Sequence, residues 1–249
     1  MLDLIEYLSN CAEPVRLKDI VASLGFPKSS AHALVQTLVA RGYAIQDHTE
    51  RYILVHASRH RSSTRANEAR LLAAAHPVME LLRDDSGETV VLAVRTTKGE
   101  PKRLAKCVSR QAVRFDIDLD TVGDAYCTAT GRLLLAHWER QHVDAYLERV
   151  PLIAMTDRTV TDRDAIRSLL VTIRESGISI CDQEHVWGST GLAAPVRDQT
   201  GAVVAALNMG VVSTRYDPRR DELIAMLLDA AFRISARLCL RRVQPDKPK

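Results

Sequence analysis

The stretch LKDIVASLGFPKSSAHALVQTLVAR, residues 17–41, decides the fold of the N-terminal part of the chain. Its first half carries apolar side chains at three- and four-residue steps, the spacing of one buried helix face: Leu17, Ile20, Val21 and Leu24. Gly25 is suited to end that helix, because glycine readily adopts the left-handed conformation of a helix C-terminus. Phe26 and Pro27 prevent the helix from continuing. The stretch therefore predicts two helices joined by a tight turn.

The second predicted helix has an apolar face and a small, polar face. We expect Ser29 or Ser30 to cap its N-terminus, whereas its core side consists of Ala31, Leu34, Val35 and Leu38. The remaining positions carry no acid and suit contacts with base edges and phosphates: Lys28, Ser29, Ser30, His32, Ala33, Gln36, Thr37 and Arg41. We interpret this helix as one that recognises DNA in the major groove, with an ordinary polar helix surface as the alternative.

A β-hairpin is predicted directly after this helix. Residues 42–46 and 51–55 are short β-prone runs, and the polar residues 47–50 separate them. Residues 1–10 supply a further helix with Leu2, Ile5 and Leu8 at core spacing. This order indicates a winged helix-turn-helix, in which Arg51 and His48 at the hairpin would contact backbone phosphate.

Composition and charge bound the class of protein. The chain has 249 residues with 46% hydrophobic content, so it can bury a sizeable core, and its net charge of +3 neither demands nor excludes nucleic acid. No run approaches the roughly 18 apolar residues of a membrane span, so we expect a cytoplasmic protein without a membrane partner. The five cysteines are scattered and lack C-x-x-C spacing, which argues against a disulfide framework, a metal site or another cofactor.

A linker is predicted between the hairpin and the rest of the chain. Residues 56–65 change in composition and suggest a hinge, and Thr64 would cap a helix over residues 67–75. Pro77 would interrupt that helix and begin another, which Gly87 ends. The linker helices either pair with those of a second copy or pack within the chain. We therefore divide the chain into a DNA-binding domain at 1–60, linker helices at 61–84, a second domain at 85–243 and a disordered tail at 244–249.

The second domain alternates between predicted strands and helices. Strands are expected at residues 89–95, 104–108, 112–117, 178–181, 191–196 and 202–209, and helices at 128–138, 163–175 and 218–240. The alternation predicts an α+β fold around a mixed or antiparallel sheet.

Several motifs give the chain a family resemblance. They are LGFPKSS at residues 24–30, TATGRLLLA at 128–136, ESGI at 175–178, the run 184–188, and LAAPVRD at 192–198. With this order and spacing, the chain resembles IclR-type transcriptional regulators along nearly its whole length. The resemblance implies a GAF-like domain that binds a small organic effector, and dimers or tetramers that bind operator DNA.

The resemblance also places an effector pocket, and this chain departs from the family pattern there. Arg132 replaces a usual lysine, and Glu184 follows Cys181 in a stretch where many members carry acids. The implied pocket residues are Ala129, Thr130, Gly131, Cys181, Gly191, Asn208 and Gly210. A carboxylate effector would use the backbone amides of the helix N-terminus at 128–131, because a helix N-terminus favours negative charge. The few charged side chains leave a neutral effector equally open.

Three functional classes remain. The first is a DNA-binding regulator controlled by a small effector, or by oxidation of Cys127 or Cys181. The second is an enzyme on the GAF-like domain with Cys127 or Cys181 as nucleophile, but no acid, base and nucleophile set supports it. The third is a winged-helix module that binds protein, which the acid-free recognition face disfavours. Asp116, Asp118 and Asp120 are interpreted as a solvated loop rather than a cation site.

Overall fold

The computed structural model describes residues 2–11, 14–41, 43–47, 49–54, 56–121 and 123–239. These residues form two compact units, at 1–69 and 70–249, and the boundary falls within one helix. Throughout the described ranges, no helix has the length and apolar character needed to cross a membrane. The predicted disordered tail at 244–249 lies outside the described residues.

The first unit is a winged helix-turn-helix, as predicted. Its elements are α1 (Leu2–Asn10), β1 (Val15–Arg16), α2 (Leu17–Leu24), α3 (Lys28–Ala40), β2 (Ala44–Gln46) and β3 (Arg51–Leu54). The three strands form an antiparallel sheet in the order β1-β3-β2. Gly25 ends α2 with a φ of 66°, and its N–H donates to the carbonyl of Val21 at 3.0 Å. Leu4, Ile20, Val35 and Tyr52 are buried in the small core that holds these elements together.

The predicted serine cap of α3 is wrong. The helix begins at Lys28 with Pro27 at the capping position, and no side chain caps it. Pro27 has a φ of −54° and a ψ of 136°, and its carbonyl accepts a hydrogen bond from the N–H of Ala31 at 3.0 Å. Because proline fixes φ in a range that suits this bend, the helix starts at Lys28, one residue before the first serine. Ser29 and Ser30 therefore lie inside the first turn.

The predicted hinge and helix break are also wrong. A single helix, α4, runs from His56 to Ser86 and contains Pro77 in its interior, so Thr64 is not its cap. An interior proline removes one helix hydrogen bond, which is destabilising by itself. The apolar stripe of α4 offsets this loss, because Leu71, Ala75, Val78 and Leu82, on both sides of Pro77, are buried in the core of the second unit. Tertiary packing thus overrides the local preference of proline.

The second unit contains one five-stranded sheet. Its strands are β4 (Thr89–Arg95), β5 (Pro101–Cys107), β6 (Ser179–Asp182), β7 (Ser189–Arg197) and β8 (Val203–Val212). They pair in the order β5-β4-β8-β7-β6, and every pair is antiparallel. The predicted strand at 112–117 is wrong, because that segment is a loop. The carbonyl of its Phe115 accepts a hydrogen bond from the Thr89 hydroxyl at 2.5 Å, so the segment is tied to the sheet by a side chain instead of a strand ladder.

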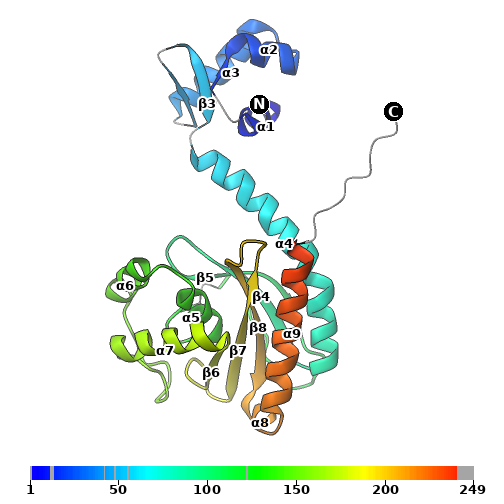
Figure 1. Cartoon of the computed structure of the whole chain (residues 1–249), viewed down its shortest axis with the longest axis vertical. Helices are drawn as coiled ribbons and strands as arrows, with labels where there is room; N and C mark the ends of the chain where they lie inside the picture. The colour runs from blue at the N-terminus through cyan, green and yellow to red at the C-terminus, as the bar shows by residue number, and fades with distance from the viewer. Residues whose placement is uncertain are drawn as a thin grey trace. The chain divides into compact units, whose positions relative to one another are not determined.

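Helices cover both faces of this sheet (Figure 1). They are α5 (Ala129–Ala136), α6 (Arg140–Arg149), α7 (Arg163–Ser176), α8 (Ser213–Tyr216), the 3-10 helix η1 (Asp217–Arg219) and α9 (Arg220–Cys239). α4 and α9 share a core with the face that carries Leu192, Ala194 and Leu207. The helices α5, α6 and α7 share another with the face that carries Cys181, Ala193 and Ala206. Successive side chains of β7 and β8 point to opposite faces of the sheet, so each strand contributes residues to both cores.

A half-buried histidine at the C-terminal end of α5, His137, provides a test of the packing around this helix. Burial, and to a smaller extent Arg197 and Arg174, lowers the pKa of His137 from 6.5 to about 4, so the native state holds a neutral imidazole. As the pH falls from 6.5 to 4, the unfolded chain takes up this proton and the native state does not. We therefore expect the free energy of unfolding to decrease over this interval.

The test is urea unfolding followed by tryptophan fluorescence, because both tryptophans of the chain, Trp138 and Trp187, lie in the second unit. Replacing His137 with glutamine should flatten the decrease between pH 6.5 and 4. The same change at the exposed His76 is the matched control and should leave it intact. Identical pH profiles for the wild type and His137→Gln would contradict the buried neutral state.

Candidate functional site

The exposed side of α3 carries most of the predicted DNA-reading residues. Ala31, Val35 and Leu38 are buried, as predicted, and Leu34 is half-buried. The exposed residues of the predicted set are Lys28, Ser29, Ser30, His32, Ala33, Thr37 and Arg41. The hydroxyl of Thr37 donates to the carbonyl of Ala33 at 2.8 Å. α3 therefore presents a narrow surface of small side chains, with cations at both ends, which suits close approach to a major groove.

Two residues of the predicted DNA surface are less accessible than expected. Gln36 is half-buried, and its amide nitrogen lies 3.3 Å from the Gln46 carboxamide oxygen and 3.4 Å from the Tyr52 hydroxyl. These contacts direct the side chain toward the hairpin. Arg51 is half-buried, and its Nε has no hydrogen-bond partner among the described residues. His48, predicted at the hairpin tip, lies outside the described residues. Sequence reasoning missed Lys18, an exposed cation on α2.

A pocket of about 70 Å³ lies on the α5 side of the sheet of the second unit. Its lining combines the sheet, the start of α5 and two loops: Val91, Pro101, Arg103, Phe115, Ile117, Thr128, Ala129, Thr130, Cys181, His185, Val186, Ser189, Gly191, Asn208 and Gly210. Strand register brings the sheet residues together, because Gly191 pairs with Cys181 on one side and with Gly210 on the other. A Cβ at Gly210 would lie 2.7 Å from the Phe115 ring, so glycine there lets the loop at 109–121 approach the sheet.

Six of the seven pocket residues predicted from sequence line this pocket, and Gly131 does not. A Cβ at Gly131 would lie 2.2 Å from the Cα of Ala125, so this glycine allows the start of α5 to pack against the preceding turn. Sequence reasoning missed Arg103, Phe115, Ile117 and His185 among others. His185 follows Glu184 in a motif, which is a usable signal, but a single sequence contains no signal for Phe115.

The polar groups of the pocket favour a ligand with negative charge. Arg103 and His185 are the basic residues of the pocket lining, and no described lining residue is acidic. Arg103 donates from Nη1 to the carbonyl of Asp118 at 3.1 Å, which holds the guanidinium near the loop. Burial lowers the pKa of His185; the nearby Asp124 raises it in part, and Arg103 lowers it to a smaller extent. The N–H of Gly131 already donates to the Thr128 hydroxyl at 3.2 Å. A ligand at the N-terminus of α5 would therefore bind the other backbone N–H groups of the first turn.

The cysteines at this site are buried. Cys127 is fully buried and Cys181 is 4% exposed, and burial raises the pKa of each thiol to about 12. The Cys181 thiol donates to the carbonyl of Cys127 at 2.9 Å. A thiol needs to ionise to act as a nucleophile or to react readily with oxidants. These surroundings therefore weigh against redox sensing through either cysteine.

A buried ion pair joins α5 to the loop that carries His185. The guanidinium of Arg132 donates to both carboxylate oxygens of Glu184 at 2.5 Å, and the two side chains are 2% and 13% exposed. Nε of Arg132 also donates to the carbonyl of Tyr126 at 2.6 Å. Burial by itself would lower the pKa of Arg132, but Glu184 raises it above its ordinary value. The pair fixes the loop between β6 and β7 against α5, beside the pocket.

Comparisons with known proteins agree with this architecture. The family "Bacterial transcriptional regulator IclR C-terminal" matches residues 64–236, and the family "IclR helix-turn-helix domain" matches residues 1–48. The chain belongs to the IclR family of transcriptional regulators. As a member of this family it is a regulator and not an enzyme, so the enzyme alternative is excluded.

Individual IclR-family proteins match over nearly the full length of the chain. The acetate operon repressor of Salmonella typhimurium is 28% identical over 237 residues, which cover 94% of this chain and 86% of the repressor. The crystal structure of a putative transcriptional regulator from a Rhodococcus species is 26% identical, with a TM-score of 0.66 and coverage of 95% and 97%. An IclR homologue from Microbacterium hydrocarbonoxydans, crystallised with 4-hydroxybenzoate, has the same fold, with 24% identity, a TM-score of 0.64 and coverage of 95% and 97%.

Proposed function

We propose that this IclR-family regulator binds operator DNA through α3 and is controlled by a small organic acid in the pocket beside α5. In this proposal, residues 1–60 read DNA, 61–84 link, and 85–243 bind the effector. The observation that carries it is the composition of the pocket: Arg103 and His185 supply positive or hydrogen-bonding groups, and Val91, Phe115 and Ile117 supply apolar surface. A monocarboxylate with an apolar body matches both.

The likeness to a relative crystallised with 4-hydroxybenzoate supports this ligand class, because that molecule combines a carboxylate with an apolar ring. The pocket volume of about 70 Å³ also favours a small ligand. We therefore take 4-hydroxybenzoate as the first probe and a panel of small monocarboxylates as the next. Binding should raise the unfolding temperature of the second unit with increasing probe concentration, because the probe binds only the native pocket.

Control of DNA binding by the effector requires two states with different affinities for the operator. We propose that the regulator acts as a homodimer or tetramer. In this assembly, ligand binding changes the angle between the recognition helices of two copies. Two half-sites are then matched in only one state, because half-sites recur at about 34 Å or a multiple of it. An equal operator affinity with and without every monocarboxylate of the panel would count against this coupling.

Substitutions on α3 separate phosphate contacts from base contacts. Lys28→Ala should weaken binding to all DNA sequences alike and reduce the salt dependence of log K by about one unit. His32→Ala should instead weaken only the preferred site, by about 1–3 kcal/mol, because a lost base contact reduces specificity. Fluorescence anisotropy at two salt concentrations measures both effects. Lys98→Ala removes one exposed charge in the second unit and is the matched control. Unchanged binding in both α3 variants would show that α3 does not read DNA.

A further inference from the structure

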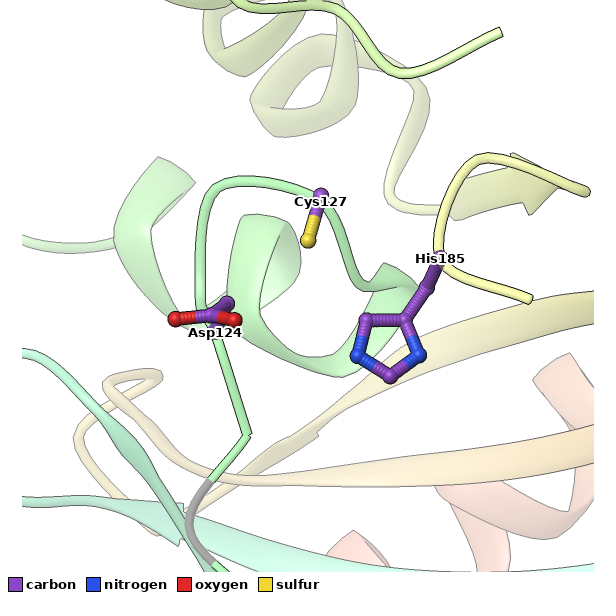
Figure 2. A group of neighbouring side chains, drawn as sticks. All are labelled: Asp124, Cys127 and His185. Atoms are coloured by element: carbon purple, nitrogen blue, oxygen red, sulfur yellow. The ribbon is translucent and has the colours of Figure 1, made fainter. Parts of the chain in front are cut away.

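A second cavity lies at the C-terminal end of α5, between α6 and α7. It has a volume of about 400 Å³ and is lined by residues within 135–144 and 167–175; we call it the α5–α7 groove. The three helices belong to the layer that covers one face of the sheet (Figure 1). The first pocket lies at the other end of α5, where His185 stands beside the turn that carries Asp124 and Cys127 (Figure 2). Among the described residues, none lines both cavities.

The floor of the α5–α7 groove is apolar. Leu135, Val143 and Leu170, one from each helix, line the groove and are buried. Val171 on α7 lines it as well, but 57% of its surface is exposed. The groove therefore continues from the packed core of these helices to apolar surface that is open to solvent. A ligand that covers this surface gains free energy, because apolar area is removed from water.

Trp138 forms one wall of the groove and is held in place by two contacts. The guanidinium of Arg95 lies 4.2 Å from the centroid of its ring, and the ring of His142 stacks on it with 4.9 Å between centroids. A wall that is already fixed costs little ordering when a ligand binds. Trp138 also places a fluorescent reporter inside the groove.

One cation that lines the groove has no acidic partner among the described residues. The charged lining residues are Arg140, Arg167, Arg174, Asp144 and Glu175. Nε of Arg167 donates to Asp144 at 2.8 Å, and Nε of Arg140 lies 3.8 Å from the same carboxyl group. Arg167 also donates to Asp164 at 2.8 Å. Arg174 is therefore the cation that remains for a ligand.

The Arg174 guanidinium is fixed by the end of α5. Its Nε donates to the carbonyl of Ala136 at 2.5 Å, and its Nη2 donates to the carbonyl of Trp138 at 2.9 Å. Its remaining N–H groups are left for a ligand. Glu175 is exposed, and no contact among the described residues holds its side chain in the groove, so it can turn toward solvent. A guanidinium held in one orientation is suited to bind a carboxylate or sulfonate.

We propose that the α5–α7 groove binds a bulky aromatic anion, with its acidic group on Arg174 and its rings against Trp138 and the apolar floor. The volume of about 400 Å³ falls in the range of small-molecule sites, roughly 300–1,000 Å³. It is much larger than the first pocket, at about 70 Å³, so the two cavities select ligands of different size. Both ligands contact α5, at opposite ends, but the groove depends on neither the proposed effector nor DNA.

A matched pair of fluorescent dyes tests both the site and its preference for an anion. 1-Anilinonaphthalene-8-sulfonate is a bulky aromatic anion, and N-phenyl-1-naphthylamine is the same molecule without the sulfonate. The full-length chain carries Trp187→Phe, which leaves Trp138 as its only tryptophan, and Gly191→Leu, which fills the first pocket. We expect about one anionic dye per chain, with transfer of excitation energy from Trp138 to the bound dye.

Three further substitutions in this chain locate the dye. Val171→Asp should weaken binding of the anionic dye about tenfold or more, because it adds a negative charge beside the apolar floor. Leu81→Asp is the matched control and should keep the affinity, since Leu81 is 48% exposed but lies on α4, outside the groove. Arg174→Gln should weaken the anionic dye about tenfold and change the affinity for the neutral dye less than about twofold, because only the anion uses the guanidinium.

Several results would overturn the assignment. Binding of the anionic dye that survives Val171→Asp, or that gives no energy transfer from Trp138, would place the dye elsewhere. Equal loss of both dyes in Arg174→Gln would rule out the preference for an anion. Absence of dye binding, together with a lower sedimentation mass in Val171→Asp, would make the groove an interface between copies of the chain. These measurements involve neither DNA nor the first pocket, so their failure is distinguishable from failure of the regulator function.

Discussion

Replacing Glu184 with alanine is expected to lower the free energy of unfolding of the second unit by about 3–5 kcal/mol. The reason is that Arg132, which is only 2% exposed, would lose both charge-assisted hydrogen bonds and remain as an unpaired buried cation. Glu184 also accepts a hydrogen bond from the N–H of Val160 at 3.2 Å, which would be lost as well. Urea unfolding followed by tryptophan fluorescence measures the change.

A double replacement separates the ion pair from the packing of its side chains. Arg132→Met combined with Glu184→Leu should recover most of the lost stability, because a buried ion pair and an apolar pair of similar size often differ little. The exposed pair Arg233 and Asp229, 3.8 Å apart, is the control, and Asp229→Ala should change stability by less than about 0.5 kcal/mol. A loss below about 1 kcal/mol in Glu184→Ala would mean that water or a rearranged loop satisfies Arg132.

Replacing Gly191 with leucine is expected to abolish the response to effector while leaving DNA binding unchanged. A Cβ at Gly191 would lie 3.3 Å from the Cβ of Ala129 and 3.7 Å from the Asn208 amide nitrogen, so a side chain fits there with a small local shift. The rest of the leucine would occupy a pocket of about 70 Å³. We expect the affinity for a carboxylate probe to fall by about 100-fold or more, which corresponds to about 2.7 kcal/mol.

Calorimetry with the tightest-binding monocarboxylate of the panel measures this effect, and anisotropy with operator DNA measures the other half of the prediction. Val203→Leu is the control, because Val203 lies on β8 outside the pocket lining and should keep wild-type affinity for the probe. Undiminished probe binding in Gly191→Leu would place the effector elsewhere. Loss of operator binding without effector would instead show that the substitution damages the fold.

Local sequence patterns predicted the helices and strands whose formation depends mainly on their own residues. Gly25 and Gly87, both predicted to end helices, have positive φ and follow α2 and α4 directly. Prediction failed where distant contacts decide the outcome. Pro77 lies inside α4 because the sheet of the second unit buries the helix on both sides of it. The helix α6 was not predicted at all, since few of its residues are apolar.

The same distinction applies to the candidate site. Cys181, Gly191, Asn208 and Gly210 were predicted because they belong to motifs with a recognisable family pattern, and they all line the pocket. Arg103 and Phe115 were missed because no local pattern links a strand at the sheet edge or a loop to this cavity. Arg132 stood out as a departure from the family pattern, but its partner Glu184 is 52 residues away and only the fold brings them together.

The most direct test of the regulator account is selection of genomic fragments by the purified full-length chain at one fixed salt concentration, with and without a pool of small carboxylates. We predict that the protein enriches a site with two inverted half-sites, and that the pool changes its recovery. His32→Ala, run in parallel, should recover the same site less selectively. Equal recovery of all fragments, both with and without the pool, would contradict the account.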